Sequence, residues 1–263
     1  MLTPEASRVE SEKGQLVAEI ARSAAEVREA QRLRYSVFAD EMGARLTGPE
    51  PGVDEDRFDK HCEHLLVRDR ASGEVVGTYR ILGPRAAQAA GGYYSEQEFD
   101  LARLAHLRPR LVELGRSCIH ADYRTGAVIT LLWSGLAQYM LSRGYTHLIG
   151  CASVSMADGG HAAANLYRRI ERDYLSPLEY RAFPRLRLPL ERLANDEEAA
   201  LPPLLKGYLR LGAYVCGEPA WDPDFNTADV LVLLPMSRVD ARYARHFIGR
   251  APTGVLAAPV RPG

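Results

Sequence analysis

The sequence predicts a mixed α/β (α+β) fold, with a central, mostly antiparallel sheet flanked by helices. Two strand-like runs, His64–Arg68 and Glu74–Leu82, surround a short polar turn and indicate an antiparallel hairpin. Further along, a strand over Leu111–His120, an apolar helix over 126–142 and a strand over His147–Ser155 indicate a crossover. Early hairpins followed by a late crossover argue against both a helical bundle and a wholly parallel, doubly wound sheet.

The elements before the hairpin are a strand near Gln15–Ile20 and a helix over Ala24–Met42. Apolar residues recur at helical spacing in that helix, and Gly43 follows it directly. An acidic loop then leads into the hairpin, where Ala71-Ser72-Gly73 supplies the turn residues. After the crossover we expect a helix over Gly160–Asp173, an exposed strand over Arg185–Leu190, a helix over Leu204–Leu211 and a last strand over Asp229–Leu234.

The chain of 263 residues is long enough for one large domain. We expect a mobile arm over 1–14, a single domain over 15–250 that includes a C-terminal extension from about residue 195, and a tail over 251–263. A formal net charge of -1 argues against a general nucleic-acid binder. The longest charge-free stretch, 125–142, is too short and too polar for a membrane span.

Four widely separated cysteines lack any CxxC spacing, and no secretory signal is visible at the N-terminus. These features favour reduced, structural thiols in a cytoplasmic protein.

Charged residues in two segments indicate a functional site. Asp54, Asp56 and Asp59 fall within six residues, and Glu113 and Arg116 interrupt an otherwise apolar strand. Charges in such places are costly unless they are paired or used. A solvated loop, a divalent-metal site without a known spacing, and recognition of a cation or pairing with Arg34, Arg80 or Arg116 remain open for the acidic segment.

A second candidate site is the turn Arg124-Thr125-Gly126, which follows the charged strand and opens the apolar helix. Free N–H groups at a helix start, with a glycine and an arginine beside them, are suited to binding phosphate. An ordinary strand–helix connection, with Gly126 present for packing, explains the same residues equally well.

The order of these motifs resembles that of the acyl-homoserine-lactone synthases and their relatives in the GNAT acyltransferase superfamily. A helix bearing Arg and Tyr-x-Val-Phe, an acidic loop, a Gly-x-x-Arg strand end and a Glu-x-x-Arg strand follow one another in that pattern. The matching segments here are Arg34–Phe38, Asp54–Asp59, Gly77–Arg80 and Glu113–Arg116. Segments 123–126, 202–213 and 240–247 also resemble the bacterial ornithine-lipid synthases, which are L-ornithine Nα-acyltransferases.

The resemblance implies a GNAT-like fold with a splayed sheet, and transfer of a 3-hydroxyacyl chain from acyl carrier protein to L-ornithine. No metal or tightly bound cofactor is expected, because the donor carries its own phosphopantetheine. Glu113, Arg116 and Arg80 are the expected catalytic group, with Glu113 as the base. Substrate contacts are expected from Arg34, Asp54, Asp56 and Asp59, and phosphopantetheine contacts from Arg124, Thr125 and Gly126.

A lipid product implies work at the cytoplasmic face of the inner membrane, and the basic and apolar run Arg181–Arg192 is the candidate contact. An edge strand protected by Arg and Pro explains that run equally well. Basic residues at 124, 143, 168 and 169 are expected to steer the acidic carrier protein. A lactone synthase using S-adenosylmethionine, an acetyl-CoA-dependent N-acetyltransferase and a non-catalytic lipid-binding module are the rival functions.

Overall fold

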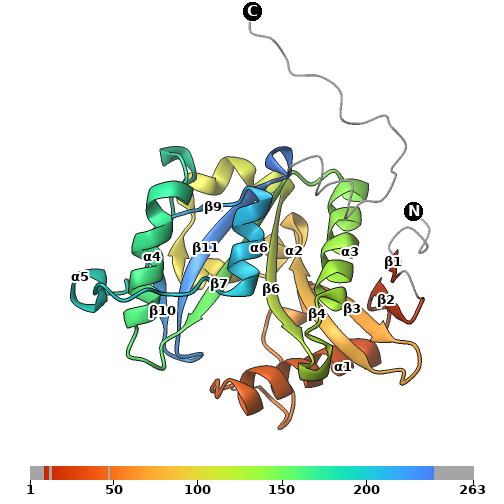
Figure 1. Ribbon diagram of the computed structural model, residues 1–263. Helices are drawn as coiled ribbons and strands as arrows, with labels where there is room; N and C mark the ends of the chain where they lie inside the picture. Colours follow the sequence, from red (N-terminus) through yellow and green to blue (C-terminus); the bar gives the residue numbers. More distant parts are fainter. Residues whose placement is uncertain (1–8, 12–13, 47, 240–263) are drawn as a thin grey trace, which may run out of the picture.

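The computed structural model describes residues 9–11, 14–46 and 48–239. A nine-stranded sheet runs through the molecule in the order β1-β2-β3-β4-β6-β7-β11-β10, and β9 pairs with β11 (Figure 1). A separate two-stranded sheet joins β5 to β8. The strands are β1 (Val9–Glu10), β2 (Leu16–Ile20), β3 (Glu63–Asp69), β4 (Val75–Leu82), β5 (Phe99–Asp100), β6 (Leu111–Ile119), β7 (His147–Ser155), β8 (Phe183–Pro184), β9 (Tyr214–Val215), β10 (Ala220–Asp222) and β11 (Thr227–Pro235).

Helices cover both faces of this sheet. They are α1 (Ala24–Tyr35), α2 (Pro84–Ala89), α3 (Ala127–Arg143), α4 (His161–Tyr174), α5 (Leu190–Leu193) and α6 (Pro203–Leu211), and a π-helix over Ser36–Glu41 extends α1. Short 3-10 helices lie at Asp59–His61, Tyr94–Gln97, Ala102–Arg110, Ala121–Tyr123, Leu178–Tyr180 and Met236–Arg238. None of the helices in the described ranges is both long and apolar enough to cross a membrane.

The predicted fold class is confirmed, because most neighbouring strands are antiparallel and β6 and β7 form the expected parallel pair. The hairpin is β3–β4, and the crossover is β6–α3–β7. The C-terminal extension adds α6 and three strands to the same body. Part of the expected arm, Val9–Glu10, is already paired with β2, whereas the tail 251–263 and the segment 240–247 lie outside the described residues.

One predicted strand is wrong. Of the run Arg185–Leu190, Arg187 makes a single isolated bridge to Ala220, and the chain turns into the short helix α5 at Leu190. Prolines at 184 and 189 flank this run, and a proline cannot donate to a strand ladder. The irregular segment therefore lies along the sheet edge without joining it.

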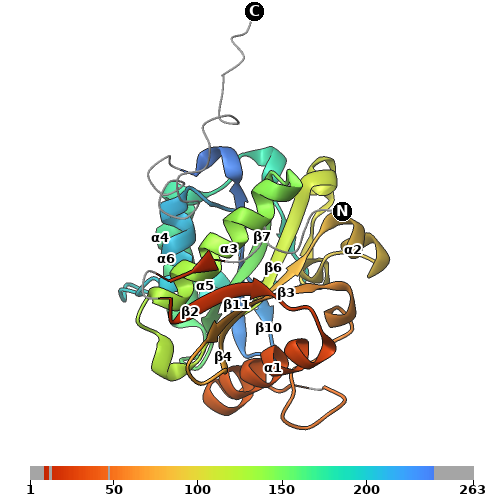
Figure 2. The ribbon, with the colours of Figure 1, turned by 90° about the vertical axis from the view of Figure 1, so that its right-hand side faces the viewer.

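The alternation of side chains along the central strands separates two apolar layers. On β3, Leu65 and Val67 pack with α3 in the largest cluster, while Leu66 points to the other face and packs with Leu33 of α1. Figure 2 shows α1 below the sheet and α3 across its opposite side. Ser23 fixes the start of α1 by accepting a hydrogen bond from the Glu26 N–H in a capping box.

The sheet is splayed where β6 and β7 diverge, and we call this opening the splay. Pairing between β6 and β7 covers three positions, from Leu111 with His147 to Glu113 with Ile149, and then stops. Past that point the edge of β6 facing β7 has no partner strand among the described residues. On its other edge β6 is irregular, because its register against β4 shifts between Thr78 and Arg80. The opening between β6 and β7 is therefore the place where a ligand has access to the interior of the sheet.

Candidate active site

A network of buried ion pairs joins the acidic segment to the end of helix α1. Arg34 Nε lies 2.7 Å from Asp54 Oδ2, and Arg34 Nη1 lies 2.6 Å from Asp59 Oδ1. The Arg34 side chain has no exposed surface. Burial by itself would raise the pKa of Asp59, but the hydrogen bond and charge of Arg34 and the charge of Arg80 hold it below its ordinary value. A substrate cannot touch Arg34 here, so its expected role as a substrate contact is replaced by one in holding the acidic loop.

Two further arginines close this network into a ring. Arg80 Nη1 lies 2.7 Å from Asp56 Oδ2 and 3.1 Å from Asp59 Oδ2. Arg116 Nε lies 3.1 Å from Asp54 Oδ2, and its Nη2 lies 3.3 Å from Asp56 Oδ2. Three arginines and three aspartates therefore alternate, and each side chain pairs with two of the opposite charge. Of the three aspartates, Asp56 keeps the largest exposure, at 23% of its side chain.

Arg116 sits at the edge of the splay in an unusual backbone conformation. Its φ of 50° is in the left-handed region, which a residue with a Cβ seldom adopts. Its guanidinium lies 4.7 Å from the Phe225 ring centre and 5.0 Å from that of Tyr94, so it is held between two aromatic faces. The ring of ion pairs and these stacked contacts together explain how the strand tolerates the irregular turn at this residue.

Glu113 makes different contacts from those the sequence suggested. Its carboxylate accepts hydrogen bonds from the Tyr94 N–H at 2.5 Å, from the Ser95 N–H at 2.7 Å and from the Ser95 hydroxyl. No ion pair to Arg80 or Arg116 forms among the described side chains. Burial raises the pKa of Glu113, and the hydrogen bonds from Ser95 and Tyr94 offset part of that shift. Backbone donors and Ser95, not arginines, therefore fix the geometry of Glu113.

A cavity of about 740 Å³ occupies the splay and passes from one face of the sheet to the other. On the α1 face its wall carries the polar and charged side chains of Ser95, Glu113, Arg116 and Asp229, beside apolar residues such as Phe38 and Phe225. On the α3 face the wall is apolar, and it is formed by Ile129, Trp133, Leu148, Leu204, Val232 and Leu234. One site therefore offers a charged compartment and an apolar compartment on opposite sides of the same opening.

A second acidic group, which the sequence reading missed, lies across the splay from Glu113. One ligand atom each from Glu98, Cys151 and Asp229 lie within 4.8 Å of one another. Cys151 Sγ is 3.7 Å from Glu98 Oε2 and also 3.7 Å from the Ser95 hydroxyl, which bonds Glu113. A chain of polar contacts thus connects β6, β7 and β11 across the cavity wall.

Burial, followed by the charge of Asp229, raises the pKa of Glu98 to about 9, and burial also raises the pKa of Asp229. The pKa of the Cys151 thiol is raised well above its usual value by burial and by Glu98. A protonated thiol is a poor metal ligand, so this group is better suited to a shared proton or an ammonium than to a soft metal. A lone acid in the apolar run Thr227–Pro235 was the available signal for Asp229; nothing in the sequence marked Glu98.

The phosphate-binding candidate lies at the mouth of the same cavity. Gly126, at φ 94°, precedes the first residue of α3, and both Gly126 and Arg124 line the cavity. Arg124 Nη2 donates to Glu41 Oε2 at 2.6 Å, and its side chain is 47% exposed. Thr125 is exposed beside them. Free N–H groups of the first turn of α3 and a partly exposed guanidinium therefore lie at one opening of the cavity.

The other basic residues expected to steer an acidic partner are scattered. Arg143 lies at the far end of α3 and pairs with Glu63, while Arg168 pairs with Glu171 on α4. They do not extend the site around Arg124.

The chain matches a known domain model and several characterised relatives. The acetyltransferase (GNAT) domain model matches residues 33–134, from α1 into α3. The chain is 38% identical over 258 residues to the L-ornithine N(alpha)-acyltransferase of Rhizobium meliloti (strain 1021), covering 92% of this chain and 86% of the relative. It is 39% identical over 259 residues to the protein of the same name from Agrobacterium fabrum, covering 90% of this chain and 87% of that one.

Solved structures show the same fold at low sequence identity. The acyl-homoserine-lactone synthase LasI is 15% identical, with a TM-score of 0.51, covering 93% of this chain and 98% of its own. The CoA-dependent acyl-homoserine-lactone synthase MesI is 12% identical, with a TM-score of 0.50, covering 89% of this chain and 96% of its own.

Proposed function

The chain belongs to the L-ornithine N(alpha)-acyltransferase family, and on that premise we propose that it transfers a 3-hydroxyacyl chain from acyl carrier protein to the α-amine of L-ornithine. The product is lyso-ornithine lipid. The observation that carries the proposal is the cavity through the splay, which joins an apolar compartment to a compartment with both signs of charge. A long acyl chain requires the first compartment, and a dibasic amino acid suits the second.

The donor enters from the α3 side. Its phosphate is bound at the start of α3 by backbone N–H groups and Arg124. The extended, amide-containing pantetheine arm then lies along β6, whose edge has no partner strand after Glu113 in the described part of the chain. This placement carries the thioester to the irregular part of β6 around Gly115 and Arg116. Backbone N–H groups there stabilise the negative charge that develops on the thioester oxygen.

Ornithine occupies the polar compartment. Its δ-ammonium is received by Asp229 and Glu98, which lack any arginine or lysine partner in the described part of the chain. Its α-amine then lies toward Ser95 and Glu113. In this arrangement Ser95 passes the amine proton to Glu113, whose raised pKa favours proton acceptance. Arg80 and Arg116 hold the acidic loop against this compartment, and Arg116 is the guanidinium nearest to the substrate carboxylate.

The reaction forms one amide bond and breaks one thioester bond. The neutral amine attacks the thioester carbon, the C–S bond breaks, and the carrier protein leaves with a free thiol. One proton leaves the amine, and the departing thiolate takes up one proton, so the step balances without a redox partner. Each residue named above binds, orients or moves a proton, and no metal is required for these roles.

An exposed apolar surface supports contact with the membrane that receives the product. Leu178, Phe183, Leu186 and Trp221 are 40–70% exposed. Arg103 joins two of them, because it donates to the Leu178 carbonyl at 2.8 Å and its guanidinium lies 5.7 Å from the Phe183 ring centre. Exposed apolar side chains beside arginines suit an anionic lipid surface. Sedimentation with vesicles containing anionic lipid tests this, with Phe183→Ser expected to reduce binding and zwitterionic vesicles as the control.

Mass spectrometry of products tests the reaction itself. The protein is incubated with 3-hydroxyacyl carrier protein and, separately, with ornithine, lysine, S-adenosylmethionine or no amine; parallel reactions use acyl-CoA and acetyl-CoA. An N-acylated ornithine formed from the carrier-protein donor is the expected product. A lactone from S-adenosylmethionine, or activity confined to acetyl-CoA, would replace the proposal by one of its rivals.

A further inference from the structure

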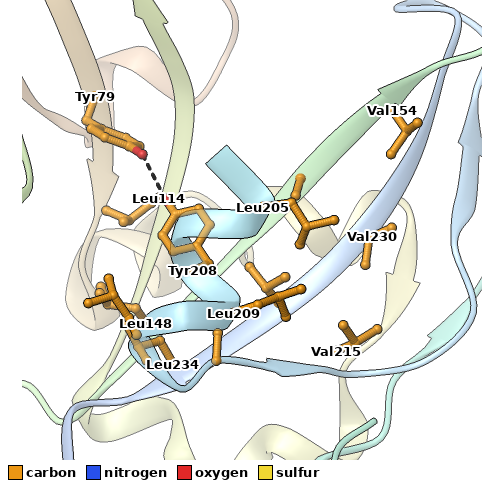
Figure 3. Packing of buried hydrophobic residues seen from close by; sticks show 14 of the residues in the cluster. Tyr79, Leu114, Leu148, Val154, Leu205, Tyr208, Leu209, Val215, Val230 and Leu234 are labelled. Atoms are coloured by element: carbon orange, nitrogen blue, oxygen red, sulfur yellow. Dashed lines mark hydrogen bonds between the residues drawn. The ribbon is translucent and has the colours of Figure 1, made fainter. Parts of the chain in front are cut away.

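Two buried tyrosines form a polar spot in the apolar half of the cavity. Tyr79 of β4 and Tyr208 of α6 lie with their hydroxyl oxygens 2.8 Å apart, and the two residues are 1% and 8% exposed. Both line the cavity in the splay. Figure 3 shows the hydrogen bond between them, surrounded by leucine and valine side chains from α6 and the neighbouring strands.

The apolar compartment continues past this spot. A smaller adjoining cavity of about 50 Å³ shares Trp133, Leu148, Tyr208 and Leu234 with the main one. Its remaining wall is apolar and is formed by Leu136, Ala137, Met140, Leu211, Met236 and Val239. A hydrocarbon chain that extends from the main cavity into the smaller one therefore passes Tyr208.

The two hydroxyls are each other's hydrogen-bond partner. Within the described residues, Tyr79 is the one hydrogen-bond partner of Tyr208. A phenol carries one donor proton and two acceptor lone pairs. Whichever tyrosine donates in their mutual bond, Tyr208 keeps capacity for one more partner in a dry, apolar wall. That remaining capacity is available to a polar group on a ligand that lies against this wall.

The spot lies near the reacting end of the donor. On β4, Tyr79 stands between Thr78, which faces Cys118, and Arg80, which faces Gly115. It is therefore opposite the irregular turn of β6 where the thioester is placed. A polar group that reaches Tyr208 must lie within a few bonds of the thioester carbon, not at the far end of the chain.

We propose that Tyr208, held in place by Tyr79, binds a hydroxyl group near the thioester end of the acyl chain and so selects hydroxyacyl donors over unsubstituted ones. A hydroxyl both donates and accepts, so it completes the bonding of Tyr208 in either orientation. The inference rests on the proposed long-chain thioester donor and goes further by naming the residues that read its hydroxyl group. A purely structural pair, fastening α6 to β4, would leave donor selectivity unaffected.

Donor binding measured without ornithine tests the proposal. Titrations compare a 3-hydroxyacyl carrier protein with an unsubstituted acyl carrier protein of equal length, for the wild type, Tyr208→Phe and Tyr79→Phe. The wild type is expected to favour the hydroxyacyl donor by about tenfold, a factor typical of one hydrogen bond in a dry site. Tyr208→Phe is expected to weaken only the hydroxyacyl donor and to bring the ratio close to one.

Tyr139→Phe is the matched control, because Tyr139 is equally buried but bonds Glu63 away from this cavity. Its donor ratio is expected to stay at the wild-type value. Equal weakening of both donors by Tyr208→Phe, or an unchanged ratio, would overturn the hydroxyl subsite. Because no ornithine is present, this result would stand even if ornithine proved not to be the acceptor. A wild-type protein that binds neither carrier-protein donor would instead contradict the proposed acyl-carrier-protein donor.

Discussion

Arg34 Nη1 donates to Asp59 Oδ1 across 2.6 Å, with at most 3% of either side chain exposed. This pair links helix α1 to the acidic loop and anchors a ring that also contains the cavity residue Arg116. The most buried part of the charged site therefore supports the geometry of its more exposed part. Removing one member of such a ring leaves a buried charge without its partner.

Asp59→Asn is expected to destabilise the fold by about 3–5 kcal/mol at neutral pH, the usual cost of breaking a buried ion pair. Denaturant unfolding measures the change. The pKa of Asp59 is lowered in the folded state, so its stabilisation is present above its ordinary value and is lost as the pH falls through the folded-state pKa. The difference between variant and wild type should accordingly shrink in acid.

Asp40→Asn is the control for this measurement, since Asp40 is an exposed acid just past α1. Its effect is expected to stay within about 0.5 kcal/mol. An Asp59→Asn protein of wild-type stability would show that the ring contributes nothing to folding.

Much of this molecule follows from local sequence rules. The β3–β4 hairpin and the helix α3 have strong local signals, namely alternating apolar residues, a glycine-containing turn and Gly126 and Gly144 at the helix ends. The run at Arg185 has a strand-like pattern, but flanking prolines and its position at the sheet edge decide otherwise.

The sequence predicted which residues belong to the site better than it predicted the contacts that those residues make. Glu113 and Asp59 stood out in the sequence because a charged side chain is costly to bury unless it is paired. Their partners depend on how distant segments meet: Ser95, which bonds Glu113, lies in the short 3-10 helix Tyr94–Gln97, which had no sequence signal. Pairing of Glu98 with Asp229 joins residues more than a hundred positions apart, and no local pattern encodes it.

Ornithine binding is expected to release a proton near neutral pH. The pKa of Glu98 is raised to about 9 beside Asp229, so this pair holds a proton that a bound ammonium would displace. The affinity for ornithine should rise with pH, up to the pH at which Glu98 and Asp229 lose their shared proton without a ligand. Calorimetry in buffers of different ionisation enthalpy measures the proton count.

Asp229→Asn is the informative variant in that experiment, because it keeps the shape and removes the charge. It should weaken ornithine binding at least tenfold and change the number of protons released, while donor binding stays unchanged. Ornithine affinity and proton release that both stay at the wild-type values in Asp229→Asn would place the ammonium elsewhere in the cavity.

Glu113→Gln is expected to lower turnover by about a hundredfold or more, because an amide cannot accept the amine proton. Single-turnover kinetics with saturating donor measure this step. The side-chain oxygen of glutamine still accepts from the Tyr94 and Ser95 N–H groups, so donor affinity should hold. Ser95→Ala removes the proposed relay and should reduce turnover in the same direction. Near-normal turnover of Glu113→Gln would move the base assignment to the aspartates of the 54–59 loop.

Arg124→Ala is expected to weaken binding of the acyl carrier protein, and more strongly at low salt. Arg124 lies at the start of α3, where its charge adds to the free N–H groups that face a phosphate. Its side chain is 47% exposed, so screening by salt reduces its contribution. Binding curves at several ionic strengths measure the effect through the salt dependence of the affinity.

Arg143→Ala provides the contrast on the same helix. The 17 residues of α3 separate the two arginines by about 25 Å, and Arg143 pairs with Glu63 away from the cavity mouth. Both variants lose one positive charge, so a general effect of net charge would weaken the carrier protein equally in the two. A phosphate held at the start of α3 instead predicts a loss specific to Arg124→Ala, with a flatter salt dependence. Equal losses in both variants would remove the start of α3 as the phosphopantetheine site.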